Sequence, residues 1–324
     1  MKQNDFGIVI QIVVAAAVVV GIVAVIVYDG GGDESTVAED FKYDVSQLRE
    51  IDESLIIYKQ DVLVIETGFE TSRAIAVDGN GAIYIAGDTA YRIFGGSEDG
   101  KMVYVGGEPG CIAVEGGRVY LGFKDHVKVC DLENGKLDRW GAVGEDAMLT
   151  SLAVDGENVF AADAVNKVVY RYEETGKLLG VVGEKDAERN IDGFVVPSPY
   201  FDIAVGGDGL LRVVNPGRHR IEAYTFDGDL EYSWGKFSNS EIEGFCGCCN
   251  PVNIAMFDNG DFVTVEKGLV RVKLYDNEGK FKGVVAGPEQ LGSDEGIYDM
   301  AVDKEGKVYV LDTVNNIIKV FLRK

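Results

Sequence analysis

The chain has 324 residues, of which 46% are hydrophobic and 26% charged, and its formal net charge at pH 7 is −23. Binding to nucleic acid depends on Lys and Arg side chains that neutralise phosphates, and docking flat on an anionic leaflet needs basic residues too. The charge therefore argues against both functions. It favours a highly soluble surface, or a partner that carries basic groups.

The first predicted element is a transmembrane helix at about residues 8–28. The run Ile8–Val27 contains 20 residues, and its only strongly polar member is Gln11. This length matches a hydrocarbon core of about 30 Å. A cleaved signal peptide is the alternative, because Ala15-Ala16-Ala17 supplies small residues, but the apolar run exceeds the ~7–15 residues of a usual signal. We expect residues 1–28 to be an uncleaved anchor.

The charges beside this helix predict its orientation. Lys2 is the only basic residue before it, whereas acidic residues follow from Asp29 onward. The positive-inside tendency therefore places the N-terminus in the cytoplasm and the rest of the chain in the periplasm or the extracellular space. Residues 29–54 are acidic and begin with three glycines at 30–32. We expect this segment to be a flexible linker.

From residue 55 onward, a short apolar phrase with alanine in its second place recurs six times. Successive alanines lie 37, 40, 51, 51 and 46 residues apart, and such a period is typical of a repeat architecture. Turns rich in Gly, Asp and Asn follow most copies, and these residues adopt a positive φ at low cost. The copies are Ile75-Ala76-Val77, Ile112-Ala113-Val114, Leu152-Ala153-Val154, Ile203-Ala204-Val205, Ile254-Ala255-Met256 and Met300-Ala301-Val302.

Each copy has room for four short strands with turns at roughly ten-residue spacing, which is typical of a propeller blade. We therefore expect residues 55–324 to form an all-β, six-bladed β-propeller. The sixth copy has no fourth strand of its own before Lys324, whereas a strand-like run at Gln60–Gly68 precedes the first copy. Pairing of this run with Ile317–Phe321 would close the ring and leave no long exposed edge.

One stretch resembles a known family. Val213–Ile221, with Asn215-Pro216-Gly217-Arg218-His219 inside it, is similar to the corner and third strand of an NHL repeat. The other five copies match this pattern more loosely, and the resemblance covers roughly residues 56–324. It implies a six-bladed propeller but no particular function, because NHL-type propellers include lyases, nucleic-acid binders and interaction platforms.

The least ordinary stretch is Phe245–Pro251, in which Cys246, Cys248 and Cys249 lie close together. In an NHL-like blade this segment would link the rim to the hub, near the mouth of the central channel. Three interpretations compete. The first is a structural disulfide among these three cysteines, which an oxidising compartment favours. The second is a transition-metal site with His219 as a fourth ligand. The third is a redox-active thiol pair.

The sequence offers little else for catalysis. It has only two histidines, His126 and His219. No phosphate loop, nucleophile elbow or dinucleotide fingerprint occurs in a suitable context. The strands expected to face the channel offer mainly Ala, Val and Ile. We therefore favour a binding protein over an enzyme, and we expect no cofactor other than a transition metal at the cysteines.

Two long loops, 183–200 and 235–250, enter neighbouring blades on the same predicted face, and long loops on a rigid scaffold commonly carry binding. We predict a membrane-tethered interaction scaffold that binds a protein, peptide or small molecule near blades four and five. A metal-dependent or thiol-redox enzyme centred on the three cysteines is the alternative. The predicted ligand-binding residues are Tyr200, Cys246, Cys248, Cys249 and Asn250.

Overall fold

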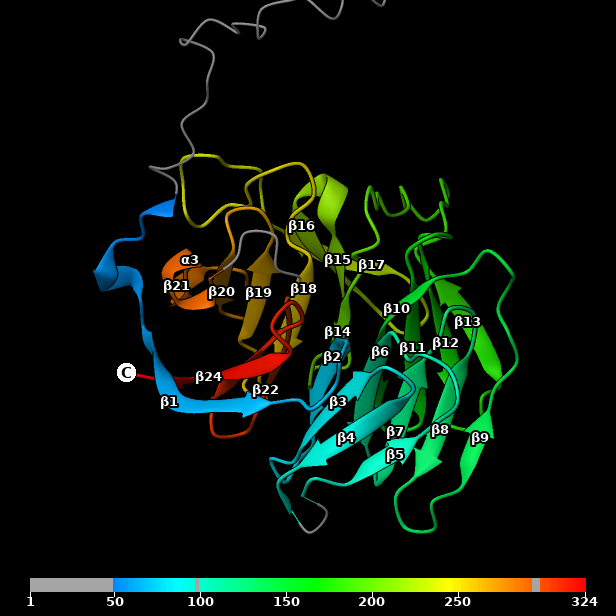
Figure 1. Cartoon of the computed structure of the whole chain (residues 1–324). Helices are drawn as coiled ribbons and strands as arrows, with labels where there is room; N and C mark the ends of the chain where they lie inside the picture. Colours follow the sequence, from blue (N-terminus) through cyan, green and yellow to red (C-terminus); the bar gives the residue numbers. More distant parts are fainter. Residues whose placement is uncertain (1–48, 97–98, 293–297) are drawn as a thin grey trace, which may run out of the picture. The chain divides into compact units, whose positions relative to one another are not determined.

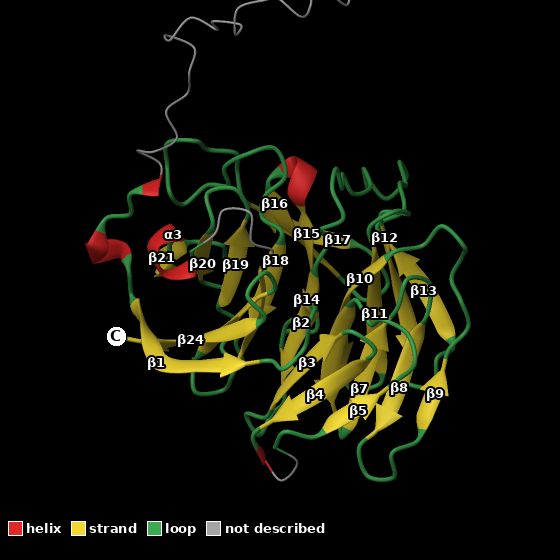
Figure 2. Cartoon of the chain, viewed as in Figure 1, coloured by secondary structure: helices red, strands yellow, loops and turns green. Residues whose placement is uncertain are grey.

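Six antiparallel sheets of four strands each make up most of the computed structural model, which describes residues 49–96, 99–292 and 298–324. In each sheet the strand that carries the repeated phrase is innermost, and the following strands lie successively further out (Figures 1 and 2). The innermost strands contact one another in a closed circle, from β2 through β6, β10, β14, β18 and β22 back to β2. The predicted six-bladed propeller is therefore confirmed.

The first three blades follow one another along the chain without interruption. Their strands are β2 (Ser72–Val77), β3 (Ile83–Gly87), β4 (Ala90–Phe94) and β5 (Met102–Tyr104), then β6 (Cys111–Glu115), β7 (Arg118–Gly122), β8 (Val127–Asp131) and β9 (Leu137–Arg139), then β10 (Leu149–Asp155), β11 (Asn158–Asp163), β12 (Val168–Glu173) and β13 (Leu178–Val182).

The fourth and fifth blades repeat this order, and the sixth takes its outermost strand from the beginning of the described chain. Their strands are β14 (Ile203–Val205), β15 (Leu211–Asn215), β16 (Arg220–Tyr224) and β17 (Leu230–Trp234), then β18 (Asn253–Met256), β19 (Phe262–Glu266), β20 (Arg271–Tyr275) and β21 (Phe281–Ala286), then β22 (Tyr298–Val302), β23 (Val308–Asp312), β24 (Ile317–Arg323) and β1 (Tyr58–Glu66).

The closing strand pairs as the sequence predicts. In the antiparallel pair of β1 with β24, Glu66 lies opposite Ile317 and Val64 opposite Lys319. A bulge between Gln60 and Val64 interrupts the register, and its residue Val62 is fully exposed. Beyond the bulge, Tyr58 is buried and its hydroxyl donates to the Gly306 carbonyl at 3.1 Å. The strand is thus attached to the sixth blade at both of its ends.

The hydrophobic core is divided into six clusters, and each lies between two neighbouring blades. Trp234 at the end of β17 illustrates this packing, because its ring lies 4.6 Å from that of Phe262 and 4.9 Å from that of Tyr275 in the next blade. Trp140 makes the equivalent contact with Tyr172, at 5.2 Å. Aromatic side chains that pack across the blade interfaces therefore help to hold the ring together.

Helices are few and short in the described part of the chain: η2 (Glu53–Leu55), η4 (Pro216–Arg218) and α3 (Pro288–Leu291). η4 forms the corner of the NHL-like stretch, between β15 and β16. No helix within the described residues is long and apolar enough to cross a membrane. The transmembrane helix predicted at residues 8–28, and most of the linker predicted at 29–54, lie outside the described residues.

Candidate functional site

The six inner strands place one equivalent residue each at the mouth of the central channel. This residue immediately precedes the repeated apolar phrase, so it occupies the same position in every blade. On one side of the ring, blades four, five and six supply carboxylate and amide groups. The six residues are, in chain order, Ala74, Cys111, Ser151, Asp202, Asn253 and Asp299.

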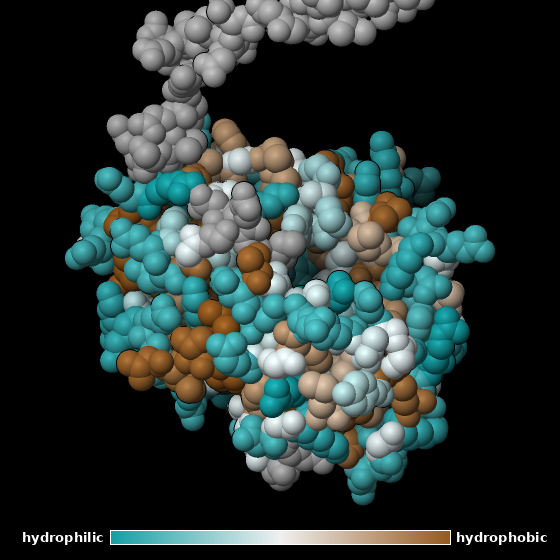
Figure 3. Space-filling model, in the orientation of Figure 1, coloured by the Kyte–Doolittle hydropathy of each residue, from teal (hydrophilic) through white to brown (hydrophobic). Residues whose placement is uncertain are grey.

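Five of these positions carry a polar or thiol side chain, and all six line a cavity of about 400 Å³. The expectation that channel-facing positions offer mainly Ala, Val and Ile is therefore wrong for this end of the channel. The corner residues Phe123 and Lys124, between β7 and β8, and the link residue Tyr200 also line the cavity. The corners and the rim-to-hub links thus share one face of the propeller, on which Figure 3 shows a central hollow.

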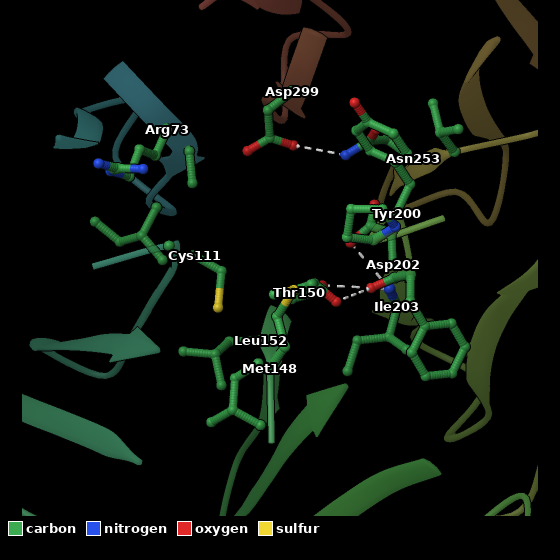
Figure 4. Close-up of a pocket in the computed structure, with 18 of the residues that line it drawn as sticks. Arg73, Cys111, Met148, Thr150, Leu152, Tyr200, Asp202, Ile203, Asn253 and Asp299 are labelled. Atoms are coloured by element: carbon green, nitrogen blue, oxygen red, sulfur yellow. Dashed lines mark hydrogen bonds between the residues drawn. The ribbon is translucent and has the colours of Figure 1, made fainter. Parts of the chain in front are cut away.

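The cavity has two chemically different walls (Figure 4). Asp202, Asn253 and Asp299 lie on one wall. Cys111, Met148 and Leu152 face them from the other, with Arg73 at the edge. The guanidinium of Arg73 forms an ion pair with Glu108 at 2.6 Å. One wall therefore offers hydrogen-bond acceptors, and the opposite wall offers apolar and sulfur surface.

Both carboxylates join neighbouring blades. The side chain of Asp202 accepts from its neighbour Ile203 N at 2.9 Å and from Ile254 N of the fifth blade at 2.7 Å. Asp299 makes the same pair of bonds one third of the ring further on, accepting from the amides of Met300 and Ile75, each at 2.9 Å. These bonds satisfy backbone amides at the hub, so the two aspartates have a structural role as well as a position facing the cavity.

Among the described residues, neither carboxylate has a cationic partner. Asn253 donates from Nδ2 to Asp299 Oδ1 at 3.1 Å and is a neutral neighbour. Burial raises the pKa of Asp202 to about 6. Burial, followed by the negative charge of Asp202, raises the pKa of Asp299 to about 7. The pair therefore carries less negative charge near neutral pH than two ordinary aspartates, and a cation between the carboxylates would favour their ionised forms.

The histidines lie outside this cavity lining. His126 Nδ1 lies 2.6 Å from Asp125 Oδ1, and His219 Nε2 hydrogen bonds to the Gly247 carbonyl at 2.6 Å. The cavity thiol, Cys111, is buried, and burial raises its pKa well above the ordinary value. A high thiol pKa disfavours the nucleophilic thiolate. The cavity therefore has the features of a binding pocket more than those of a nucleophilic active site.

The cysteine segment lies beside the cavity, on the link between β17 and β18. Of the predicted ligand-binding residues, Tyr200 lines the cavity, whereas Cys246, Cys248, Cys249 and Asn250 do not. Asn250 is buried and holds the loop: its Nδ2 donates to the Cys246 carbonyl at 2.5 Å, and its Oδ1 accepts from Lys267 N at 2.8 Å. The Lys267 ammonium lies 4.6 Å from the centre of the Tyr200 ring, so the segment adjoins the cavity wall.

All five cysteines carry free thiols in this structure. Cys248 Sγ and Cys249 Sγ lie 3.2 Å apart, and Cys246 differs from them because its backbone amide donates to Glu266 Oε1 at 2.7 Å. Across the described ranges, no three His, Cys, Asp or Glu side chains are grouped as a metal site. The disulfide and the metal site with His219 as a fourth ligand stay predictions.

Comparison with known proteins adds information on the fold. The fold is that of a six-bladed β-propeller. No family model matches the chain, and no curated protein matches it, so membership of the NHL family stays a prediction.

The propeller is similar to several solved structures. One is a protein of unknown function from Bacteroides thetaiotaomicron, with a TM-score of 0.58 and 18% identity over 84% of this chain and 74% of that one. Another is the WD40 β-propeller domain of Doa1, with a TM-score of 0.57 and 16% identity over 82% of this chain and 85% of that one. A third is a catalytically inactive virginiamycin B lyase from Staphylococcus aureus with quinupristin, with a TM-score of 0.55 and 12% identity over 82% of this chain and 100% of that one. At these identities the likeness concerns the fold alone.

Proposed function

We propose that this protein is a membrane-tethered binding propeller that faces the periplasm or the extracellular space. The apolar run at residues 8–28 supports the tether, and Lys2 with the acidic residues after the run supports the orientation. The propeller supports a binding role, because its rigid blades present long loops around one central cavity.

The ligand of this proposal is a small molecule, or a side chain of a peptide or protein, that carries an ammonium or guanidinium group beside an apolar part. The observation that carries the proposal is the pair Asp202 and Asp299, which face one cavity without a cationic partner among the described residues. The wall with Cys111 and Leu152 would receive the apolar part. A volume of about 400 Å³ falls in the range of roughly 300–1,000 Å³ typical of small-molecule sites.

The test uses three probes of equal size: hexylammonium, hexanol and hexanoate. Isothermal titration calorimetry on the full chain in detergent micelles should detect the cation and not the alcohol or the carboxylate. Asp202→Asn and Asp299→Asn should each weaken its binding by about tenfold to a hundredfold, since a hydrogen bond to a charged group contributes ~1.5–3 kcal/mol. Asp138→Asn, at an exposed residue of β9, is the matched control. Equal affinity for all three probes would refute the proposal.

The same site predicts a dependence on pH. The cation prefers ionised carboxylates, and the pKa values of Asp202 and Asp299 are raised to about 6 and about 7. Protonation as the pH falls through this range removes the negative charge, so the affinity for hexylammonium should decrease from pH 8 to pH 5. Titrations at intervals of half a pH unit would check the sign. An affinity that rises toward acid pH would contradict the role of the carboxylates.

The location has its own test. In cells that express the full chain, we expect it to stay in the membrane pellet after carbonate washing. We also expect it to be degraded by protease added outside the cytoplasmic membrane, to spheroplasts where the cells have an outer membrane. Deletion of residues 8–28 should release the propeller into the soluble fraction. Protection from external protease, with degradation only after lysis, would reverse the proposed orientation.

A further inference from the structure

Cys248 and Cys249 lie beside residues that come from other loops of the propeller. Cys248 is exposed, whereas Cys249 is buried, with 3% of its surface exposed. Lys267, at the corner between β19 and β20, and Ser198, on the link into the fourth blade, both approach Cys249. The Lys267 ammonium donates to Ser198 Oγ at 3.0 Å. Three separate loops on the channel face therefore meet at one thiol.

These neighbours shift the pKa values of the two thiols in opposite directions. Burial opposes ionisation of Cys249, but hydrogen bonds from Lys267, Cys248 and Ser198 outweigh it and lower the pKa of this thiol. The hydrogen bond to Cys249 and its negative charge raise the pKa of Cys248. The two sulfurs lie 3.2 Å apart and share a hydrogen bond, and the Lys267 ammonium favours the charged form of Cys249. Lys267 thereby favours the loss of one proton from the pair, and a thiolate is the reactive form of cysteine.

We propose that Cys248 and Cys249 form a thiol–disulfide exchange site at the edge of the channel mouth, with Lys267 as its positioning residue. The substrate class is a disulfide that can reach the exposed Cys248, either in a small molecule or on the surface of a protein. Cys246 takes no part. This site is separate from the carboxylate cavity, although Lys267 and Tyr200 lie between the two.

The exchange has two balanced steps. The thiol pair first loses one proton to water, and Cys248 passes its own proton to Cys249. Cys248 then attacks one sulfur of the incoming disulfide, so that a mixed disulfide forms and the second sulfur leaves as a thiolate. Cys249 then loses that proton to the leaving thiolate and attacks Cys248 Sγ. The first sulfur leaves as a thiolate, and a Cys248 to Cys249 disulfide remains. Two electrons pass from the protein to the substrate, which is released as one thiol and one thiolate, and the thiolate takes a proton from water to become the second thiol.

The other thiols of the described chain lack these features. Cys111 and Cys130 are buried in clusters between blades. Burial also raises the pKa of Cys111. Cys246 is attached through its backbone amide to the buried carboxylate of Glu266. The combination of an exposed sulfur, a contacting second sulfur and a lysine is thus particular to Cys248 and Cys249.

The test treats the reduced full chain, in detergent micelles, with glutathione disulfide and follows the cysteines by mass spectrometry without reduction. We expect a Cys248 to Cys249 disulfide and two glutathione thiols released per chain. Cys249→Ser should stop the reaction at a stable Cys248–glutathione adduct, and Cys248→Ser should slow the release of glutathione by at least tenfold. Modification of Cys246 in preference to Cys248, or an unchanged rate in Cys248→Ser, would overturn the proposal.

The role of Lys267 needs a measurement that loss of structure alone would not reproduce. Lys267→Gln should shift the pH profile of the exchange rate toward higher pH and lower the rate at pH 7 by about tenfold, whereas Lys267→Arg should restore the profile. Lys280→Gln, at an exposed lysine of the same blade, should leave it unchanged. A pH profile that Lys267→Gln does not move would contradict the assignment. Binding of hexylammonium to the same variants reports on the cavity alone. A variant that loses the exchange reaction but still binds hexylammonium has therefore lost only the thiol site.

Discussion

Deletion of Tyr58–Glu66, the whole of β1, should lower the melting temperature of the protein by roughly 10 °C or more. The deletion removes the pairing with β24 and also the buried side chain of Tyr58, which packs in the core cluster between the fifth and sixth blades. Loss of a large buried aromatic side chain alone costs about 3–5 kcal/mol, and each kcal/mol shifts the melting temperature of a domain this large by about 2–4 °C. Differential scanning calorimetry would measure the shift.

A milder variant and a matched control complete this experiment. Tyr58→Ala should show about half of the effect and keeps the strand, so it yields a result even where the deleted chain aggregates. The double variant Val62→Ser and Leu63→Ser alters two exposed side chains in the bulge, so its melting temperature should stay within about 2 °C of the parent. If the variant without β1 has the same melting temperature as the parent protein, closure of the ring by β1 contributes nothing to stability.

The second large effect is expected at Glu266, which is fully buried in the fifth blade. One carboxylate oxygen lies 2.8 Å from Arg271 Nε and 3.1 Å from Lys273 Nζ, and the other accepts from Cys246 N at 2.7 Å. Glu266→Gln keeps the shape but leaves two buried cations without their counter-charge. Breaking a buried ion pair in this way costs about 3–5 kcal/mol. Urea denaturation at pH 7 should show a loss of this size.

The loss should depend on pH with a definite sign. Burial lowers the pKa of Lys273 to about 8. Above this pH the lysine of the folded parent protein is neutral and no longer depends on the Glu266 charge, so the difference between the parent and Glu266→Gln should shrink as the pH rises through about 8. Glu305→Gln breaks an exposed pair with Lys307 and should cost less than about 1 kcal/mol at every pH. A constant or growing loss above pH 8 would contradict the coupling to Lys273.

Lys273 also explains how this network reaches the cysteine segment. Its ammonium donates to the carbonyls of Ile242 at 3.0 Å and Gly244 at 2.6 Å, and it lies 4.6 Å from the centre of the Phe245 ring. The loop before the cysteines is therefore attached to the fifth blade by a buried cation. We expect Glu266→Gln to loosen this loop as well, which faster hydrogen exchange at residues 242–246 would report.

The blades were predictable because the local signals and the overall fold agree. The same order of apolar strands and glycine turns recurs six times. A strand that is poorly marked in one copy can therefore be assigned from the equivalent strand of another copy. The closing strand was predictable for the same reason: Gln60–Gly68 has the strand pattern but no place in the first copy, and the sixth blade lacks one strand. Only the bulge between Gln60 and Val64 has no evident signal in the sequence.

The carboxylate wall was missed although a signal for it exists. The residue just before each apolar phrase is Asp202, Asn253 or Asp299 in three consecutive blades. Because equivalent positions of a propeller converge on its axis, alignment of the six copies at this position indicates an acidic patch at the hub. The apolar residues of each phrase indicate the fold, whereas the position just before the phrase indicates the site.

The surroundings of Cys249 could not be predicted in the same way. Ser198 and Cys249 are 51 positions apart and occupy equivalent places in successive copies, since each lies six residues before the alanine of its apolar phrase. Lys267 lies 18 positions after Cys249, and the repeat gives no reason to expect it at that thiol. Their meeting depends on the paths of irregular loops over the channel face, which are determined by side-chain contacts such as those of Asn250. The sequence could place the cysteines near the channel mouth, but not identify which of them has the lowered pKa.

The way in which β1 closes the ring has a consequence for biosynthesis. The hydroxyl of Tyr58 bonds to Gly306, 248 positions further along the chain. On the ribosome, β1 therefore emerges long before its partner and waits while the intervening blades are translated and stack upon one another. Until then the nascent protein is an open arc with two unpaired sheet edges, and such edges invite pairing between neighbouring chains. Premature termination anywhere within the last blade would make that vulnerable intermediate permanent.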